Sequence, residues 1–521
     1  MSSKPKQGVI KDIMDKAKAE QKAKFDHSKS MEKKDRNRSF SENVKSSLVP
    51  LSDLHRNSIS ESEIKTVSSR YGDSIMSIRS VTHPTSYLET TIHVLKGNVG
   101  AGLLAMGDVL KNSGILFGPI LLITMGIICT YCIHLLLVCA NKCAIKWRLP
   151  VDPTFAETIE LSFKLGPKIF KRTSRLAKSL LVCSLIGTQL GFCSVYYLII
   201  GKAVGRYFQL AGINYDIRIY LSVIYPVILA MVLIRSLKFL APLSLIANIF
   251  ILLAVTMVLI VACQDLPNIT EREVLRPVER WPFAFGTIIF AYEGINLVIP
   301  LRNEMKKPST FQTLFGVLNV SMTLVILLYT TFGLISYWKY GNDILGNVST
   351  NLPEGHWTTL ISDGSLSVAL LFSYPLQFHV AFKVIYELLV EKLGAWVETG
   401  KRILILEILV RFFLVTLTCL FAMFIPHLSL VISLVGAMCS SWLAILLPVL
   451  AHISLYSPWS KNHKENNVIR GSYICKLWFG LFINIICLFV GIAGFILGTY
   501  VATVDLISKI NEDYIARPPH V

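Results

Sequence analysis

From about residue 88 onward, the chain alternates long apolar segments with short polar loops. The apolar segments run for about 18 to 28 residues, and a helix of that length crosses a hydrocarbon layer of about 30 Å at about 1.5 Å per residue. Strands of a membrane β-barrel would be shorter and would alternate in polarity. We predict eleven transmembrane helices, at about residues 88–112, 114–139, 177–201, 217–235, 238–263, 282–303, 311–337, 358–390, 403–425, 427–455 and 473–503.

The composition is typical of a protein that crosses a membrane many times. Of the 521 residues, 53% are hydrophobic and only 16% are charged, and the mean hydropathy is +0.55. A soluble chain of this length is less apolar and carries a larger charged fraction. The predicted fold class is therefore all-α, with a lipid bilayer as the surroundings of the helices.

The N-terminal region has a different composition. Residues 1–85 are rich in Lys, Ser, Asp and Glu and poor in aromatic residues, so they bury too little apolar surface to offset chain entropy. Before residue 88, seventeen Lys and Arg stand against eleven acidic residues, which favours the cytosolic side. We predict a disordered basic cytosolic tail at 1–85, an eleven-helix membrane domain at 86–505, and a short extracellular or luminal tail at 506–521.

The net charge of +17 is distributed as a membrane protein requires. The basic residues lie in the tail and in alternate loops, and no stripe of basic and aromatic residues accompanies them, so we expect no nucleic-acid partner. The chain lacks the Gx4GK[ST] loop of ATP-driven pumps. Most of its eleven cysteines lie in apolar segments, which favours small buried side chains over a disulfide framework. We predict no cofactor and no metal site.

Two Asn-x-Ser/Thr sequons fall in loops that this orientation places outside the cytosol. They begin at Asn268 and Asn347, and N-glycans are added only on that side. Two others, at Asn37 and Asn319, fall in the cytosolic tail and inside a helix. We predict glycosylation at Asn268 and Asn347 alone.

A glycine-rich stretch interrupts the first apolar segment. Gly97, Gly100 and Gly102 lie within six residues. Lipid cannot hydrogen-bond a bare backbone, so a non-helical segment at membrane depth persists only where it is buried in protein or lines a wet cavity. We predict a discontinuous helix whose free N–H groups hold a substrate carboxylate.

A second break is predicted in the sixth apolar segment. Tyr292-Glu293-Gly294 lies mid-segment and Pro300 follows, and both glycine and proline weaken a helix. Broken first and sixth helices are typical of a fold built from two inverted five-helix repeats. The substrate amine would face carbonyl groups of this second break. The predicted substrate-binding residues are Gly97, Asn98, Val99, Gly100, Ala101, Gly102, Phe290, Ala291, Tyr292 and Gly294.

Five ionisable residues lie inside predicted helices, where they are costly and point to function: His93, Lys96, Asp108, Glu293 and His379. A buried imidazole beside the break can exchange a proton near neutral pH, so His93 is a proton-coupling candidate; the alternative is a neutral histidine bonded to the backbone. Glu293 is the other candidate. It could carry the proton, bind the amine, or lock the broken helix. Lys96 can equally be structural or extend to the membrane surface.

Five stretches resemble motifs of one known family in the same order. They are HVLKGNVGAGLL from His93, TQLGFCSVYY from Thr188, FGTIIFAYEGINLVIPLRNEMKKP from Phe285, YPLQF from Tyr374 and IPHLSLVISLVGAMCSS from Ile425. Together they resemble the proton-coupled amino-acid transporters, the PAT branch of the amino acid/auxin permease family. The likeness spans about residues 84 to 505.

The resemblance implies eleven helices with a LeuT-like core in the first ten, a cytosolic N-terminus, and symport of small neutral amino acids with protons at the plasma membrane or on endolysosomes. It also implies that His93 is the family's essential first-helix histidine and that Gly97 to Gly102 form the unwound segment. Tyr292-Glu293-Gly294 would correspond to the family's Phe-Glu-Gly.

This sequence departs from the family pattern at three places that bear on substrate choice and coupling. The cysteine pair with which some members bridge outer loops has no obvious counterpart here. The Gly-Leu-Pro that usually follows the first-helix glycines is replaced by Ala105-Met106-Gly107, and Asp108 comes next. The family's Pro-Leu-Glu-Asn after the sixth helix is replaced by a sequence that places Arg302 where the family has an acid, which reverses a charge at the inner end.

We therefore predict a proton-coupled symporter of small neutral amino acids, and not an enzyme, since none of the histidines begins an HxxxxD acyltransferase motif. Two alternatives stay open. The chain could be an amino-acid sensor that signals through a cytosolic partner on its N-terminal tail, and then removal of residues 1–80 would abolish signalling and spare uptake. It could also be a pH-independent facilitative transporter, which would not accumulate substrate against a gradient.

Overall fold

A computed structural model describes residues 84–149, 151–234, 237–393, 400–456 and 471–515. Nine helices within these ranges are long and apolar enough to cross a membrane. The one β-bridge in the described ranges joins Thr85 to Met305. The prediction of an all-α, multi-pass membrane fold is confirmed, and the predicted N-terminal tail lies almost wholly outside the described residues.

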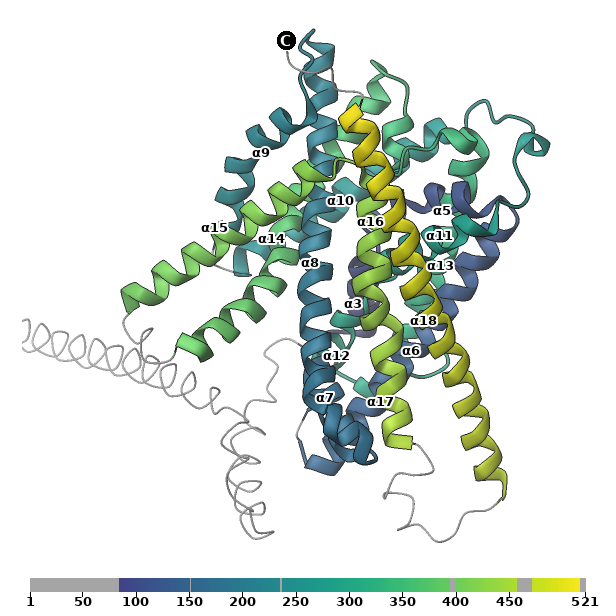
Figure 1. Cartoon of the computed structure of the whole chain (residues 1–521), viewed down its shortest axis with the longest axis vertical. Helices are drawn as coiled ribbons and strands as arrows, with labels where there is room; N and C mark the ends of the chain where they lie inside the picture. Colours follow the sequence, from purple (N-terminus) through teal and green to yellow (C-terminus); the bar gives the residue numbers. More distant parts are fainter. Residues whose placement is uncertain (1–83, 150, 235–236, 394–399, 457–470, 516–521) are drawn as a thin grey trace, which may run out of the picture. The chain divides into compact units, whose positions relative to one another are not determined.

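The helices follow one another along the chain with the labels of Figure 1. They are α3 (Tyr87–Asn98), α4 (Ala101–Leu104), α5 (Met106–Ser113), α6 (Phe117–Trp147), α7 (Phe155–Leu165), α8 (Lys168–Leu210), α9 (Ile217–Val232), α10 (Leu237–Ala262), α11 (Trp281–Ala291), α12 (Ile295–Glu304), α13 (Val317–Tyr340), α14 (Trp357–Leu393), α15 (Gly400–Phe424), α16 (Leu428–Val435), α17 (Leu447–Tyr456) and α18 (Gly471–Ile515). Two π-helical turns, Gly436–Ser440 and Trp442–Leu446, join α16 to α17.

Each of the eleven predicted segments falls on a helix or on a set of consecutive helices, but several boundaries were wrong. Helix α18 continues through residues 506–515, which we expected to form a tail. Helix α7 was not predicted. It is amphipathic and short, and it begins with a capping box in which the Glu157 N–H donates to Thr154 Oγ1 and the Thr154 N–H donates to Glu157 Oε2. A search for long apolar segments does not detect such a helix.

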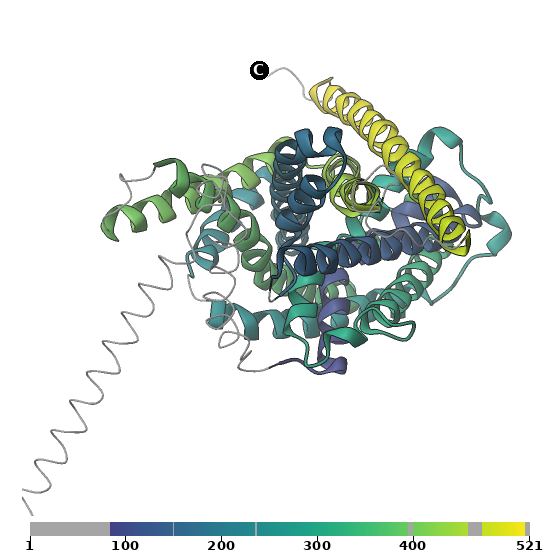
Figure 2. The ribbon, with the colours of Figure 1, turned by 90° about the horizontal axis from the view of Figure 1, so that it is seen from below.

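The helices pack in two groups. Helices α3, α5, α6, α11, α12 and α13 contact one another and form the first group, which we call the core group. Helices α8, α9, α14 and α15 contact one another and form the second, which we call the scaffold group. Helix α10 packs on α14 and α13 and so contacts both groups, and α16 lies between α8 and α11. Figure 2 shows α18 at the periphery, beside α16 and α17.

The two ends of the helices are named after the predicted orientation. The inner end carries Thr85, α7 and the C-terminal end of α12. The outer end carries the C-terminal end of α5, the loop of residues 263–280 and the loop of residues 341–356. Both broken segments, α3 to α5 and α11 to α12, run from one of these ends to the other.

Candidate functional site

The first predicted break is present in the structure. Helix α3 ends at Asn98, Val99 has an extended backbone, and a new helix begins only at Ala101. Among the described residues, the N–H groups of Gly100, Ala101 and Gly102 have no hydrogen-bond acceptor. Three backbone donors are thus available at the point where the sequence predicted them.

The second break has the same construction. Helix α11 ends at Ala291 and α12 begins at Ile295. Between them the Gly294 N–H donates to the Tyr292 carbonyl at 2.8 Å, and Leu297 N–H donates to the Gly294 carbonyl at 3.2 Å. Among the described residues, the Ile289 and Phe290 carbonyl groups at the end of the first half and the Ile295 and Asn296 N–H groups at the start of the second half have no backbone partner.

The two breaks touch each other. A Cβ atom at Gly102 would lie 2.9 Å from Cα of Ala291, and one at Gly294 would lie 2.6 Å from Nδ2 of Asn98. A larger residue at Gly102 would meet the Ala291 backbone and push the two segments apart, whereas one at Gly294 would displace the Asn98 side chain. Gly102 therefore allows the two backbones to approach each other directly.

Tyr329, on α13, links the two breaks. Its hydroxyl lies 2.6 Å from the Asn98 carbonyl oxygen and 3.0 Å from the Ala291 carbonyl oxygen, and its side chain is fully buried. These are the last carbonyl groups of α3 and α11, each at the negative end of a helix dipole. One hydroxyl proton is therefore shared between two converging helix ends. Sequence reasoning missed this residue, because a tyrosine within an apolar helix is indistinguishable from packing.

Glu293 lies in the second break with only 7% of its surface exposed. Its Oε1 accepts a hydrogen bond of 3.0 Å from Nδ2 of Asn296, and its Oε2 is buried with no partner among the described residues. A buried carboxyl oxygen without a donor is costly when ionised and suits a group that holds a proton. Glu293 is therefore buried at the second break.

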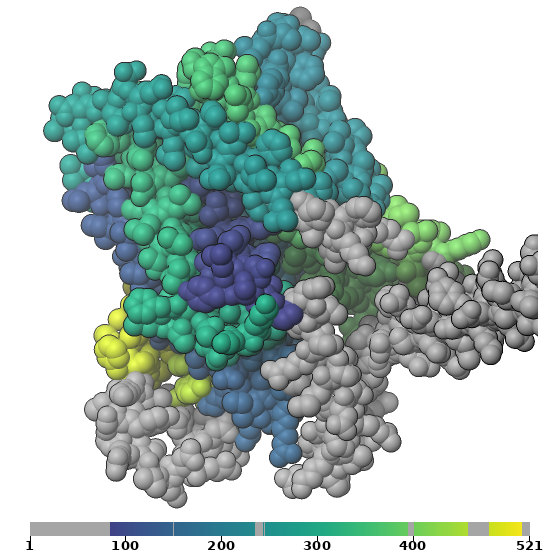
Figure 3. Space-filling model, turned by 180° about the vertical axis from the view of Figure 1, so that it is seen from behind, coloured from purple at the N-terminus to yellow at the C-terminus, as the bar shows by residue number. Residues whose placement is uncertain are grey.

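His93 lies elsewhere. It is on α3, more than one turn before the break, and its side chain is exposed. Figure 3 shows that the start of the described chain, in purple, forms part of the surface on this face. The expectation of a buried histidine was therefore wrong, because packing covers the side of α3 that carries Thr91, Val94 and Asn98 and leaves position 93 uncovered. Its part in proton coupling stays a prediction.

Aromatic residues of α8 form a wall beside the breaks. The hydroxyl of Tyr196 lies 3.9 Å from the position of a Cβ at Gly100, and the ring of Phe192 lies 4.4 Å from that of Phe290 between ring centres. Tyr374 on α14 shares a hydrogen bond of 2.7 Å with Thr418 on α15. Tyr196 and Phe192 thus bring the scaffold group to the site, and Tyr374 packs within that group.

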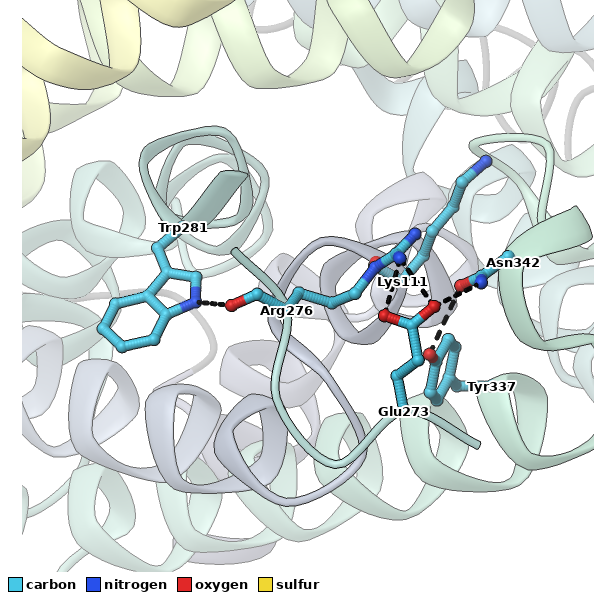
Figure 4. Close-up of polar contacts among 6 residues, drawn as sticks. All are labelled: Lys111, Glu273, Arg276, Trp281, Tyr337 and Asn342. Carbon is cyan, nitrogen blue, oxygen red and sulfur yellow. Dashed lines mark hydrogen bonds and ion pairs between the residues drawn. The ribbon is translucent and has the colours of Figure 1, made fainter. Parts of the chain in front are cut away.

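The loop of residues 273–281, which we call the strap, connects the outer ends of the two broken segments (Figure 4). The Arg276 guanidinium donates to the Lys111 carbonyl at the end of α5 at 2.9 Å and pairs with Glu273 at 2.7 Å. The Trp281 indole N–H, at the start of α11, donates to the Arg276 carbonyl at 3.1 Å. Hydrogen bonds from Asn342 and Arg276 hold the pKa of the Glu273 carboxyl below its usual range.

The inner end is held by polar contacts as well. Arg302 on α12 pairs with Asp152, which precedes α7, at 2.8 Å, and the Asn303 side chain donates to the Asp152 carbonyl at 3.0 Å. Burial raises the pKa of the Asp152 carboxyl, and the Arg302 charge opposes that rise. The reversed charge at position 302 therefore has an acidic partner in this chain.

The two predicted glycosylation sites differ in exposure. Asn268 is exposed in the outer loop. Asn347 lies in an outer loop as expected, but only 2% of its surface is exposed and its Oδ1 accepts from the Ser349 N–H at 3.0 Å. A glycan needs open space around the amide nitrogen, so the geometry disfavours Asn347, and glycosylation stays a prediction at Asn268.

Comparisons with known proteins agree with this architecture. Residues 83–504 match the family model described as transmembrane amino acid transporter protein. The chain is 31% identical, over 84% of its length and 88% of the relative's, to the proton-coupled amino acid transporter-like protein pathetic of Drosophila melanogaster. It is 25% identical, over 71% of its length and 84% of the relative's, to the amino acid transporter AVT3C of Arabidopsis thaliana. The chain therefore belongs to the transmembrane amino acid transporter family, the amino acid/auxin permeases, in its proton-coupled amino-acid transporter branch.

Proposed function

We propose that this protein is a secondary active transporter that carries small neutral amino acids together with protons. The observation that supports this most strongly is the contact between the two helix breaks, where free N–H groups, free carbonyl groups and a buried carboxyl group lie side by side. A zwitterion needs this combination of donors and acceptors when it leaves water. The proton-coupled relative in Drosophila supports the same reading.

The substrate carboxylate is expected to bind the N–H groups of Gly100 to Gly102. The amine then faces carbonyl groups at the end of α11, near Tyr292. Phe290 and Tyr196 border the same space, with 0% and 5% of their surfaces exposed, so they leave little room for a side chain. This crowding is the physical basis for proposing small neutral substrates.

Transport in this proposal is a movement of the core group against the scaffold group. Eleven crossings, a LeuT-like pair of inverted repeats and a cytosolic N-terminus are part of the proposal, and the membrane is the plasma membrane or that of endolysosomes. Access alternates as the inner contacts of Arg302 and the outer strap of Arg276 break and re-form in turn, since each ties a broken segment to its surroundings.

The coupled proton is assigned to Glu293, with His93 as the group that exchanges it with the aqueous phase. Glu293 is buried at the break and has one oxygen without a partner. His93 is exposed on the inner half of the other broken segment, on α3. Protonation of Glu293 removes the cost of its buried charge when the substrate enters.

The test is uptake into proteoliposomes that contain the purified full-length protein. A panel of labelled amino acids, including glycine, alanine, proline, leucine, lysine and glutamate, is offered with and without an inward proton gradient. The proposal expects accumulation of small neutral amino acids that depends on the gradient. Equilibration without accumulation under both conditions would instead identify a facilitative transporter, and uptake of large or charged substrates alone would overturn the substrate class.

A further inference from the structure

A cavity of about 470 Å³ opens at the outer end, away from the two breaks. Helix α5 contributes Asp108 and Lys111 to its wall, and the outer part of α8 contributes Lys202 and Arg206. The loop of residues 344–350 and the start of α16 complete it. The cavity therefore lies between the core group and the scaffold group.

Two of the cationic side chains in this wall are already engaged. The Lys111 ammonium donates to the Ile344 carbonyl at 2.7 Å. The Arg206 Nη2 pairs with Asp363 on α14 at 2.7 Å and donates to the Ser349 carbonyl at 3.1 Å, whereas its Nε and Nη1 are buried without a partner among the described residues. These contacts fix the loop of residues 344–350 in place, so Lys111 and Arg206 build the wall of the cavity.

Asp108 and Lys202 have no such partner. Asp108 is 97% buried, since 3% of its surface is exposed, and its Oδ2 has no hydrogen-bond partner among the described residues. Lys202 is partly buried, and no hydrogen bond or ion pair of its ammonium group occurs in the described part of the chain. The two groups form no ion pair with each other, although both line the same cavity.

Asp108 and Lys202 line the same cavity without contacting each other. Each therefore lacks a partner of opposite charge, which a buried charged group needs. A ligand with a positive group at one end and a negative group at the other would satisfy both at once. An α-amino acid in its zwitterionic form has that charge arrangement, and the volume of the cavity accommodates one together with ordered water.

We propose that this outer cavity is a second amino-acid site, in which Asp108 binds the ligand's ammonium group and Lys202 binds its carboxylate. The choice of an amino acid as the ligand rests on the proposed function; the pairing of charges does not. A ligand held in this way connects α5 of the core group to α8 of the scaffold group. It therefore acts on the movement of the two groups as well as on the supply of substrate to the breaks.

The proposal is tested by equilibrium binding of labelled L-alanine to the purified full-length protein. The variants are Asp108→Asn, Lys202→Met and Gly102→Leu, and Glu354→Gln is the control, because Glu354 lines the same cavity but is exposed at its rim. The wild type is expected to bind two alanines per chain. Asp108→Asn and Lys202→Met should each weaken one of the two by about ten- to a hundredfold, as expected for loss of a hydrogen bond to a charged group. Gly102→Leu should abolish binding of the other alanine, at the breaks.

A thermodynamic cycle with modified ligands identifies the partners. L-Alaninamide lacks the carboxylate and N-acetyl-L-alanine lacks the charged amine. The losses of binding free energy caused by N-acetylation and by Asp108→Asn should not be additive, because both remove the same contact. The same holds for the losses caused by amidation and by Lys202→Met. The losses of binding free energy should be additive when N-acetylation is combined with Lys202→Met, or amidation with Asp108→Asn. Full additivity in all four combinations would overturn the assignment even if a variant were poorly folded, since a general defect weakens every ligand alike.

The failure of this inference can be told apart from failure of the proposed function. If one alanine binds per chain and only Gly102→Leu abolishes it, the outer site is refuted while the site at the breaks stands. If proteoliposomes show no amino-acid uptake but binding still depends on Asp108 and Lys202 in the cycle above, the outer site stands and transport is refuted.

Discussion

The guanidinium of Arg302 lies 2.8 Å from Oδ2 of Asp152 and joins α12 to the segment before α7. Both side chains are largely buried, with 12% and 11% of their surfaces exposed. The family resemblance alone would suggest that a positive charge at position 302 disturbs the inner end. The structure instead shows a paired charge, so the departure from the family pattern is compensated within this chain.

Removal of the positive charge at position 302 should make stability depend on pH. Burial already raises the pKa of the Asp152 carboxyl, and Arg302 opposes that rise. In Arg302→Gln the pKa of Asp152 should rise further. A carboxyl whose pKa is raised on folding destabilises the folded state as pH increases through that pKa. Thermal unfolding in detergent should therefore show a larger loss of stability at pH 7.5 than at pH 5.

The double variant Arg302→Gln/Asp152→Asn is the control for this effect. It removes the titrating group, so the difference in stability between pH 5 and pH 7.5 should return to that of the wild type. An equal loss of stability for Arg302→Gln at both pH values would show that Asp152 does not carry the effect. The absolute cost of leaving a buried partner uncompensated is about 3 to 5 kcal/mol for fully buried pairs, and less is expected at this partly exposed one.

Gly102→Ala should reduce uptake by more than tenfold while Gly480→Ala leaves it unchanged. A Cβ at position 102 would lie 2.9 Å from Ala291 Cα, whereas one at position 480 would have no heavy atom within 4 Å. Backbone cannot yield as a flexible side chain can, so the two breaks must separate. Uptake of labelled alanine by proteoliposomes measures the effect, and equal activity of the two variants would show that the contact between the breaks is not required.

The two breaks were predictable from sequence because their cause is local. Glycines at 97, 100, 102 and 294 weaken the helix wherever the segment is placed. Inside a membrane, a non-helical segment persists only where it is buried in protein or lines a wet cavity. The partners of these breaks were not predictable. Tyr329 is 231 residues from Asn98, and only packing of α13 against α3 and α11 brings its hydroxyl to their ends.

The exposure of individual side chains could not be predicted from the sequence either. His93 and Val94 are adjacent in an apolar segment, yet one is exposed and the other buried, because the packing partner of α3 decides which face is covered. Asn347 lies in a loop between two predicted helices, as the sequence indicated, but that loop folds back into the molecule and buries it. The length and apolar composition of each segment predicted the helices well, whereas the direction of a side chain could not be predicted.

Tyr329→Phe should destabilise the protein and slow transport together. The change leaves the Asn98 and Ala291 carbonyl groups without the hydroxyl donor that they share, and an unsatisfied buried acceptor costs about 1 to 3 kcal/mol. Tyr500→Phe, at an exposed position on α18, is the matched control. Unfolding temperature and uptake should both fall for the first variant; normal uptake by Tyr329→Phe would mean that the shared proton has no role in holding the breaks.

Arg276→Ala should impair transport more than Glu273→Gln does. The arginine holds the end of α5 through the Lys111 carbonyl, whereas Glu273 contributes an exposed ion pair, which is worth below about 1 kcal/mol. The lowered pKa of Glu273 means that its stabilising contribution is present above its ordinary pKa and is lost only as pH falls through the lowered value. The strap should therefore stay intact at mildly acidic pH, and uptake compared between the two variants at pH 5 and pH 7 tests this.

Glu293→Gln and His93→Ala should separate the transport of substrate from the transport of protons. Glutamine keeps the shape of Glu293 but holds no exchangeable charge, so Glu293→Gln should still exchange labelled alanine across the membrane and should lose accumulation driven by a proton gradient. His93 is exposed, on the inner half of the first broken segment, so its removal should slow delivery of the proton and leave binding of alanine unchanged. Exchange and gradient-driven uptake are measured in the same proteoliposomes. If His93→Ala keeps the full response to the gradient, the proton reaches Glu293 by another route, and if Glu293→Gln keeps it, the carboxyl group is a structural lock on the broken helix.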